Sequence, residues 1–138
     1  MDNSGATYSV WVPYHKESAE KARKLAEGCK TPLAKYKVIT DYVSRCFAYD
    51  YIKAVKVAKK RGVLPDVDHV WKLHMGICQD IAAMTVGMLR AVGIEAYLCI
   101  GTIGGRIHHA WVEAIIDGHV YRYDHDGEAA VYKEERRY

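Results

Sequence analysis

The stretch that decides the fold is Gly76-Ile77-Cys78-Gln79-Asp80-Ile81-Ala82-Ala83-Met84-Thr85-Val86-Gly87-Met88-Leu89-Arg90-Ala91-Val92-Gly93. Apolar side chains recur in it every three or four residues from Cys78 onward, which predicts a helix over residues 78–92 with one buried side. Glycine is the usual residue just beyond a helix end, so Gly93 marks the stop. The sequence therefore predicts a long, half-buried helix that begins at a cysteine.

Two more helices are predicted upstream. Residues 17–27 place Ala and Leu on one face and charged side chains on the other, and glycine follows as a stop signal. Thr31-Pro32 is a start signal, because a hydroxyl cap precedes proline at the first helical position; this helix is expected to end near residues 45–47. The pattern of the lysine-rich run 52–61 does not distinguish a helix from a loop, and its lysines are expected on a solvated face. Residues 62–68 are predicted to be a loop.

Antiparallel strands are predicted after the helices. Asp117-Gly118 is the preferred pair for a two-residue hairpin loop. The strand segments are residues 95–100, 107–116 and 119–124, with a glycine-rich turn at 101–105. Helices first and antiparallel strands later predict an α+β fold. A chain of 138 residues is too short for two ordinary domains, so we expect one domain over residues 1–138.

Composition and charge exclude several classes of protein. Lys and Arg number 20 against 17 Asp and Glu, and a net charge of +3 is too small to indicate a nucleic-acid or membrane partner. No run of about 18 apolar residues is present, so no membrane span is predicted. Half of the residues are apolar, enough for a core without metal or disulfides. The four cysteines match no zinc-ribbon spacing: Cys29, Cys46, Cys78 and Cys99.

Cys78 is the candidate nucleophile. At a helix start the first N–H groups have no internal partner and the helix dipole places partial positive charge there, so a thiolate is favoured over a thiol. The same N–H groups can hold the oxyanion that forms when a carbonyl is attacked. Gly76 lets a substrate backbone approach closely. The simpler explanation of a cysteine is a small buried apolar residue, so the assignment depends on partners elsewhere in the sequence.

The predicted hairpin supplies these partners. Side-chain alternation and cross-strand pairing around its two-residue loop place His109, Trp111 and Asp124 on one face of the sheet. Asp124 could then fix the tautomer of the His109 imidazole and stabilise its imidazolium, the third role in a Cys-His-Asp triad. Asp126 lies opposite His109 in this register and is the rival acid. Trp111 is predicted to be a core or cleft-wall residue.

Two other interpretations stay open. His74, Cys78 and either His108 or His109 could form a zinc site, although Gly76 interrupts the helical face that would align the first two, and tetrahedral zinc needs ligands converging at about 2.0–2.3 Å. The domain could also be a catalytically inactive binding module. We expect no metal and no other cofactor.

These motifs resemble those of the transglutaminase-like superfamily, in particular its small bacterial members. The resemblance is carried by Gly76-Ile77-Cys78-Gln79-Asp80-Ile81-Ala82-Ala83, Met88-Leu89-Arg90-Ala91-Val92-Gly93-Ile94-Glu95-Ala96, His109-Ala110-Trp111-Val112-Glu113 and Asp124, with Tyr49-Asp50 and Pro65-Asp66-Val67-Asp68 upstream. They are similar to the family's nucleophile helix, histidine strand and third catalytic residue, in the family's order, over residues 36–124. Family members often have Asp-Pro-Thr after the histidine strand, where this chain has Asp124-His125-Asp126.

The resemblance implies a papain-like transglutaminase core, in which a cysteine-bearing helix packs on an antiparallel sheet that carries His and Asp. It implies a thiol enzyme in which Cys78, His109 and Asp124 attack a peptide or protein amide and form an acyl-enzyme, which an amine resolves by transamidation or water by hydrolysis. Tyr49 or Tyr51 would supply the second oxyanion donor. Relatives of this kind are often exported, so we expect a secreted or cell-envelope location, with the cytoplasm as the alternative.

Overall fold

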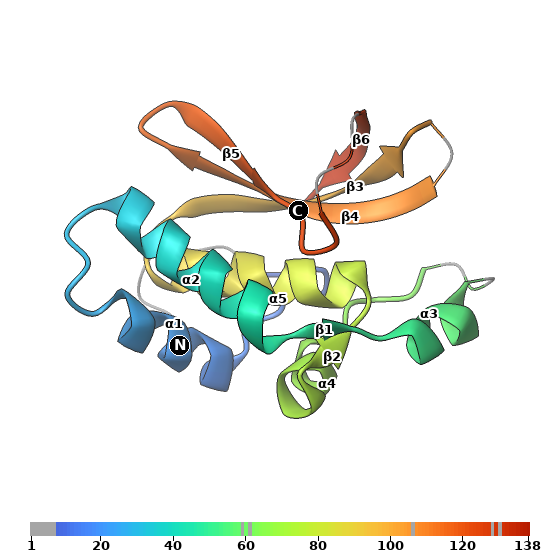
Figure 1. Cartoon of the computed structure of the whole chain (residues 1–138), viewed down its shortest axis with the longest axis horizontal. Coiled ribbons are helices and arrows are strands. Elements are labelled where there is room, and N and C mark those ends of the chain that lie inside the picture. Colours follow the sequence, from blue (N-terminus) through green and yellow to red (C-terminus); the bar gives the residue numbers. More distant parts are fainter. Residues whose placement is uncertain (1–7, 59, 61, 106, 128, 130) are drawn as a thin grey trace.

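The chain folds into a four-stranded antiparallel sheet with helices packed on one of its faces (Figure 1). The computed structural model describes residues 8–58, 60, 62–105, 107–127, 129 and 131–138. The helices are α1 (Lys16–Ala26), α2 (Pro32–Cys46), α3 (Tyr51–Val57), α4 (Val67–Leu73) and α5 (Cys78–Ala91). The strands are β1 (Ala48–Tyr49), β2 (Met75–Gly76), β3 (Glu95–Ile103), β4 (Ile107–Ile116), β5 (His119–Tyr123) and β6 (Tyr132–Arg137). The predicted α+β class is confirmed.

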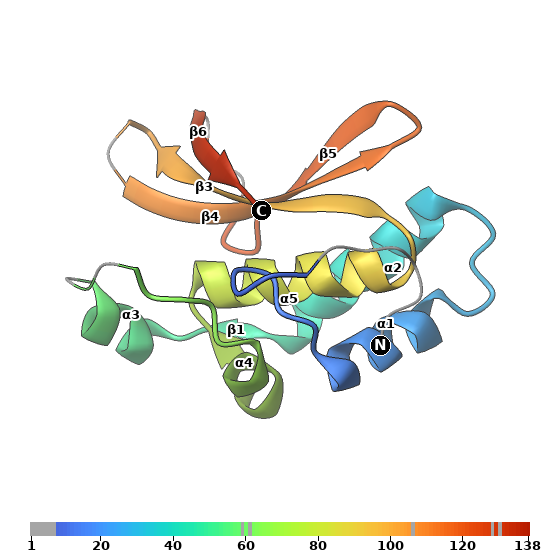
Figure 2. The same ribbon diagram turned by 180° about the vertical axis from the view of Figure 1, so that it is seen from behind.

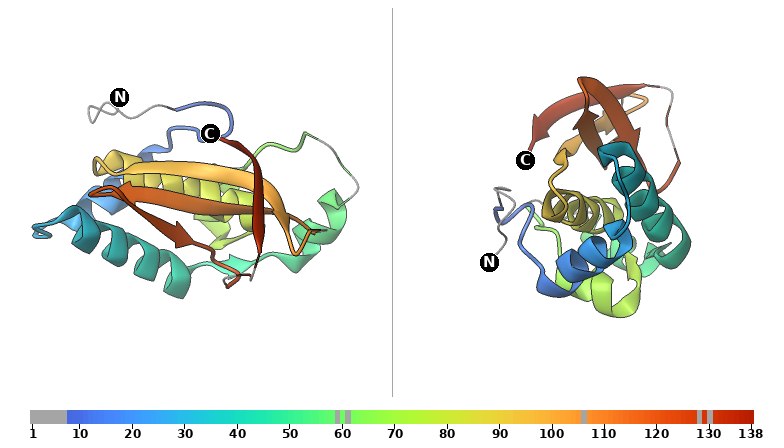
Figure 3. Two further views of the ribbon diagram at one scale, coloured as in Figure 1. Left: turned by 90° about the horizontal axis from the view of Figure 1, so that it is seen from above. Right: turned by 90° about the vertical axis from the view of Figure 1, so that its left-hand side faces the viewer.

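The cysteine-bearing helix α5 is the central element of the fold. It contacts β3 and β4 on one side and α1, α2 and α4 on the other, so it lies between the sheet and the remaining helices (Figure 3). Ile81, Met84 and Leu89 are fully buried on it. Burial of each such side chain stabilises the fold by about 1.5–3 kcal/mol. This packing fixes the first residue of α5 against the sheet.

The predicted helices are present with small differences at their ends. α2 begins after Thr31, whose hydroxyl accepts a hydrogen bond from the Ala34 N–H at 3.1 Å. The lysine-rich run contains α3, which has no buried residue and extends from the body of the molecule at the end opposite α1 (Figures 1 and 2). Lys59 and Arg61 of that run lie outside the described residues. No helix in the described part of the chain is long and apolar enough to cross a membrane.

The hairpin formed by β4 and β5 has the predicted register. Glu113 pairs with Arg122, and Ile116 pairs with His119 across the two-residue loop. The predicted pairing of His109 with Asp126 is wrong, because β5 ends at Tyr123 and the chain turns at once, with the Gly127 N–H donating to the Asp124 carbonyl at 3.1 Å. Asp124 therefore lies on the turn and not within a strand.

Four elements of the described chain escaped prediction: the helix α4, the edge strand β6, and the two-residue strands β1 and β2. α4 begins inside the segment predicted as a loop, where Asp66 caps it by accepting from the His69 N–H. β6 is almost entirely charged, so its sequence lacks the apolar alternation that signals a strand. Gly101 lies within β3 and not in the predicted turn. Its missing side chain lets β6 approach, because a Cβ there would come within 1.9 Å of the Lys133 carbonyl oxygen.

Candidate active site

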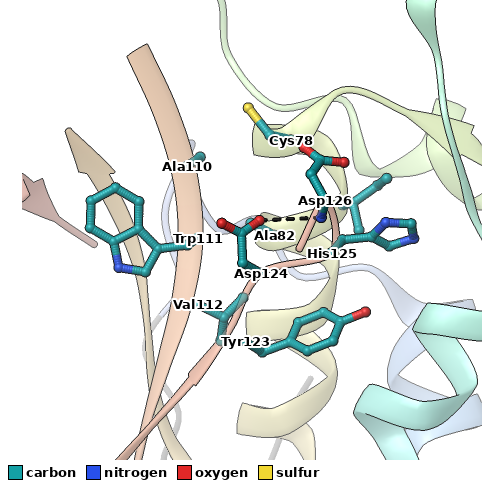
Figure 4. Close-up of a pocket in the computed structure, with 10 residues that line it drawn as sticks. Cys78, Ala82, Ala110, Trp111, Val112, Tyr123, Asp124, His125 and Asp126 are labelled. Carbon is teal, nitrogen blue, oxygen red and sulfur yellow. Dashed lines mark hydrogen bonds between the residues drawn. The ribbon is translucent and has the colours of Figure 1, made fainter. Parts of the chain in front are cut away.

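Cys78 is the first residue of α5, and the local structure leaves its backbone N–H available. The helix begins after Ile77, whose N–H donates to the Asp80 carboxylate at 3.1 Å. Among the described residues no acceptor takes the N–H of Cys78. Figure 4 shows Cys78 at the end of the helix, next to Asp126 and the strand that carries Ala110. The half-buried thiol thus lies where the helix dipole favours negative charge.

The carboxylate of Asp80 holds this end of the helix in place. It is fully buried, receives the Lys53 ammonium at 2.6 Å and accepts the Asp66 N–H at 2.9 Å. α3, the start of α4 and the start of α5 are therefore tied to one side chain. Because Lys53 balances its charge, Asp80 does not cancel the favourable field at the nearby thiol.

His109 and Asp124 form a buried hydrogen-bonded pair beside Cys78. His109 Nε2 lies 2.8 Å from Asp124 Oδ2, and their side chains are 7% and 2% exposed, so little water competes for the bond. This leaves Nδ1 as the ring nitrogen available to the thiol. Burial alone would lower the pKa of His109, but interactions with Asp124 and Cys78 outweigh it and raise the pKa to about 10. These interactions favour the imidazolium form of His109 over the neutral imidazole.

Asp124 stays ionised in spite of its burial. Burial by itself would raise its pKa, but hydrogen bonds from His109 and Tyr132 lower the pKa below its ordinary value. The Tyr132 hydroxyl donates to Oδ2 at 2.8 Å, and the Asp126 N–H donates to Oδ1 at 3.2 Å. Figure 4 shows the latter bond as a dashed line. Both oxygens of the Asp124 carboxylate thus accept hydrogen bonds, and these bonds orient it toward His109.

Tyr132 was not found by sequence reasoning. It stands in β6, outside the region of family resemblance and in a strand without apolar alternation, so no local signal marked it. Its hydroxyl accepts the Ala129 N–H at 2.8 Å, its ring packs edge-on against Trp111 at 4.8 Å, and Arg122 lies over its face at 4.0 Å. These contacts fix the hydroxyl on Asp124.

Tyr132→Phe is expected to slow alkylation of Cys78 by iodoacetamide about tenfold at pH 7, because a hydrogen bond to a charged group is worth about 1.5–3 kcal/mol. Without it Asp124 loses a partner that orients it toward His109, so the imidazolium is less well positioned beside Cys78. Tyr97→Phe is the matched control, since the Tyr97 hydroxyl bonds Glu95 away from the site. Equal rates in the two variants would contradict this role.

Asp126 lies close to the pair without joining it. One ligand atom each of His109, Asp124 and Asp126 lies within 4.8 Å of the others, so these three could hold a metal ion. An ion there would have to displace the hydrogen bond between His109 Nε2 and Asp124. The geometry therefore favours Asp124 as the partner of His109 and Asp126 as a support for Asp124.

The zinc alternative has no converging ligand set in the described part of the chain. His74 stacks on Phe47 with ring centroids 4.6 Å apart, and its Nδ1 lies 3.0 Å from the Cys46 carbonyl oxygen. The candidate metal-binding groups among the described residues contain neither His74 nor Cys78. The four cysteines are free thiols, of which Cys46 is exposed and Cys99 is buried.

The two candidate oxyanion tyrosines differ in their exposure and in their electrostatic interaction with the thiol. Burial and the nearby Cys78 both raise the pKa of Tyr49, which places its hydroxyl within electrostatic range of the thiol. Tyr51 is 75% exposed and packs against the Tyr49 ring at 4.8 Å. Tyr49 is therefore the better placed of the two.

Gly76 and Trp111 have structural explanations for their identity. Gly76 is buried, and a Cβ there would lie 2.7 Å from Val70 Cγ2, so helix packing requires glycine. Trp111 is 1% exposed, lies alongside the His109 ring at 6.3 Å and donates its indole N–H to Glu113 at 3.1 Å. Trp111 therefore covers the His109 imidazole as part of the core. The predicted contacts of Gly76 and Trp111 with a substrate stay predictions.

A cysteine at the start of a central helix, facing a histidine on an antiparallel sheet that is hydrogen-bonded to a buried Asp, defines the papain-like class of thiol-enzyme folds. The chain belongs to the transglutaminase-like superfamily, whose profile matches residues 19–125. A comparison with proteins of curated function gave no match.

Solved structures with the same fold are similar to this chain. A protein of Cytophaga hutchinsonii, provisionally named a cysteine protease, matches with a TM-score of 0.67 and 20% identity over 86% of this chain and 39% of its own. A provisionally named protease of Parabacteroides distasonis matches with a TM-score of 0.64 and 22% identity over 78% of this chain and 22% of its own. A TGase matches with a TM-score of 0.64 and 19% identity over 88% of this chain and 34% of its own. The chain thus spans well under half of these longer proteins, and such identities show the fold alone.

Proposed function

We propose that the protein is a thiol enzyme that attacks amide carbonyls of peptides or proteins and forms an acyl-enzyme on Cys78. The observation that carries this proposal is the buried His109–Asp124 pair, 2.8 Å apart, beside a cysteine at a helix start. Membership of the transglutaminase-like superfamily supports the same class of chemistry.

The proposed reaction begins with the thiolate of Cys78. It attacks the amide carbon, and the oxyanion is held by the Cys78 N–H and the Tyr49 hydroxyl. The His109 imidazolium gives its proton to the leaving amine as the C–N bond breaks, which leaves a thioester. An incoming amine or water then loses a proton to His109 and attacks the thioester, the C–S bond breaks, and the thiolate is restored. Asp124 keeps one ring tautomer and stabilises the charged imidazole throughout.

Water is favoured over an amine as the acceptor of the acyl group. The groove that contains Cys78 is open and about 790 Å³ in volume, so water reaches the thioester freely unless a bound amine excludes it. We therefore propose hydrolysis as the main reaction, with transamidation when an amine is abundant. The ratio of amide product to hydrolysed product, measured in the presence of a fluorescent amine, gives the partition of the thioester between amine and water.

Selective alkylation at pH about 6 tests the proposal, because an ordinary thiol is almost wholly protonated there. Iodoacetamide should label Cys78 at least about tenfold faster than the exposed Cys46, as judged by peptide mass spectrometry. His109→Ala should remove most of that advantage by deleting the imidazolium. If Cys78 reacts no faster than Cys46, the result would contradict the enzyme proposal and favour the catalytically inactive binding module.

A further inference from the structure

The surface around Cys78 carries two grooves of different chemistry. The first, which we call the basic groove, has a volume of about 790 Å³ and is lined, beside Cys78 and His109, by Trp11, Lys60, Val63, Gln79, His108 and Arg136. The second has a volume of about 710 Å³ and is lined by Tyr49, Tyr51, Ala54, Val55, His125 and Asp126. Among the described residues, the basic groove is lined by no Asp or Glu, whereas the second has Asp126 as its charged group. A substrate that crosses Cys78 therefore meets a cationic wall on one side.

Arg136 is positioned in the basic groove by aromatic stacking. It pairs with Ile100 in the sheet, and its guanidinium lies 5.2 Å from the centroid of the Trp11 ring and 6.0 Å from that of Tyr138. Trp11 and Tyr138 themselves stack at 4.8 Å. Stacking occupies the flat face of a guanidinium and leaves its edge N–H donors free to bind a carboxylate in bidentate fashion. Within the described residues no carboxylate pairs with Arg136.

The opposite wall of the basic groove contributes Lys60 and is tied to the helix of the nucleophile. The Gln79 side chain donates to the Val63 carbonyl at 2.7 Å, which fixes this segment next to Cys78. Lys60 and His108 are exposed, and neither forms an ion pair with another described residue. Cationic side chains thus stand on both walls of a groove that opens on the reacting thiol.

We propose that the basic groove binds a carboxylate of the peptide substrate, so that acidic peptides are preferred at the position that lies in it. This inference rests on the proposed function and adds the substrate class. The net charge is only +3, and of the 20 Lys and Arg side chains the described lining of the basic groove contains two, Lys60 and Arg136, which favours a single local anion over an extended polyanion. The apolar lining of Trp11, Val63 and Ile100 suits the peptide chain that carries the carboxylate.

A matched pair of alkylating peptides tests this proposal. Chloroacetyl-Gly-Glu-amide and chloroacetyl-Gly-Gln-amide form a thioether with Cys78 and release chloride, and they differ in one charge. The Glu peptide should react about 3- to 10-fold faster with the wild-type protein, and 0.5 M NaCl should reduce that ratio. The ratio should fall to near one in Arg136→Gln/Lys60→Gln and be largely retained in Arg136→Lys. Lys30→Gln/Lys37→Gln removes the same charge from exposed positions outside the basic groove and should keep the wild-type ratio.

The outcomes separate this proposal from the proposed function. The imidazolium of His109 attracts the Glu peptide equally in all of these variants, so only the change between variants reports on the basic groove. A ratio that is the same in wild type and in Arg136→Gln/Lys60→Gln would overturn the carboxylate site while leaving a fast reaction with iodoacetamide intact. If Cys78 behaves as an ordinary thiol toward iodoacetamide, the enzyme proposal fails, yet the slow alkylation by the two peptides still gives the ratio.

Discussion

Asp124→Asn is expected to lower kcat/KM for an acylating substrate by about 10²–10⁴-fold and to shift the alkaline limb of its pH profile downward. The amide can present its NH₂ group to His109 Nε2, which favours the wrong ring tautomer and removes the charge that balances the imidazolium. The shape of Asn matches that of Asp, so the turn around residue 124 should persist. The measurement is kcat/KM from pH 5 to 11.

The direction of the pH shift follows from the raised pKa of His109. In the wild-type protein that pKa is about 10, so the imidazolium that protonates the leaving amine persists until the pH nears 10. Loss of the Asp124 charge should lower this limit by about 1–3 units. The same shift affects stability: a His109 whose pKa rises from 6.5 to about 10 on folding stabilises the fold fully below pH 6.5, and this contribution is lost as the pH rises toward 10. In Asp124→Asn most of that pH dependence should disappear.

Asp126→Asn is the matched control and decides between the two candidate acids. Its backbone N–H, which donates to Asp124, is unchanged by the substitution. Burial raises the pKa of the Asp126 carboxyl, and no hydrogen bond joins this carboxyl to His109 in the described part of the chain. We therefore expect a change in kcat/KM of less than about fivefold and an alkaline limb that stays near pH 10. A large effect in Asp126→Asn with a small one in Asp124→Asn would reverse the assignment.

Asp80→Ala is expected to lower the free energy of unfolding by about 3–5 kcal/mol, because it leaves the Lys53 ammonium and two backbone N–H groups without their acceptor. Urea unfolding followed by tryptophan fluorescence gives this value. The start of α5 should also lose its fixed position, so alkylation of Cys78 at pH 6 should slow in the fraction that remains folded.

Two further variants serve as comparisons for Asp80→Ala, one at the same buried ion pair and one at an exposed ion pair. Lys53→Met leaves the buried carboxylate unpaired and should also destabilise the protein, whereas Asp41→Ala removes an exposed ion pair with Arg45 on α2 and should cost at most about 1 kcal/mol. An Asp80→Ala protein as stable as Asp41→Ala would show that the buried pair does not hold the site together.

Sequence reasoning reached the parts of the fold that depend on local patterns. The apolar period after Cys78, the hydroxyl-proline start at Thr31 and the two-residue loop at Asp117 each have a short-range physical cause, and each element was predicted close to its observed place. Side-chain alternation from that loop brought His109 and Asp124 to one face, and the structure places them 2.8 Å apart. Family resemblance connected them to Cys78.

Other features are set by contacts between distant segments, and only the tertiary structure decided them. β6 is charged and forms because its backbone pairs with the edge of β3, where Gly101 allows a close approach. Tyr132 reaches Asp124 only through that pairing. The pairing of Lys53 with Asp80 and the stacking of Arg136 on Trp11 likewise join residues whose identities carry no local signal. The sequence by itself determined the cysteine helix and the hairpin, and it brought His109 and Asp124 to one face, since periodicity and turn chemistry act over a few residues. The contacts that support the candidate site and the side chains that line the groove beside it were decided by long-range packing, because hydrogen bonds and ion pairs between distant segments leave no period in the chain.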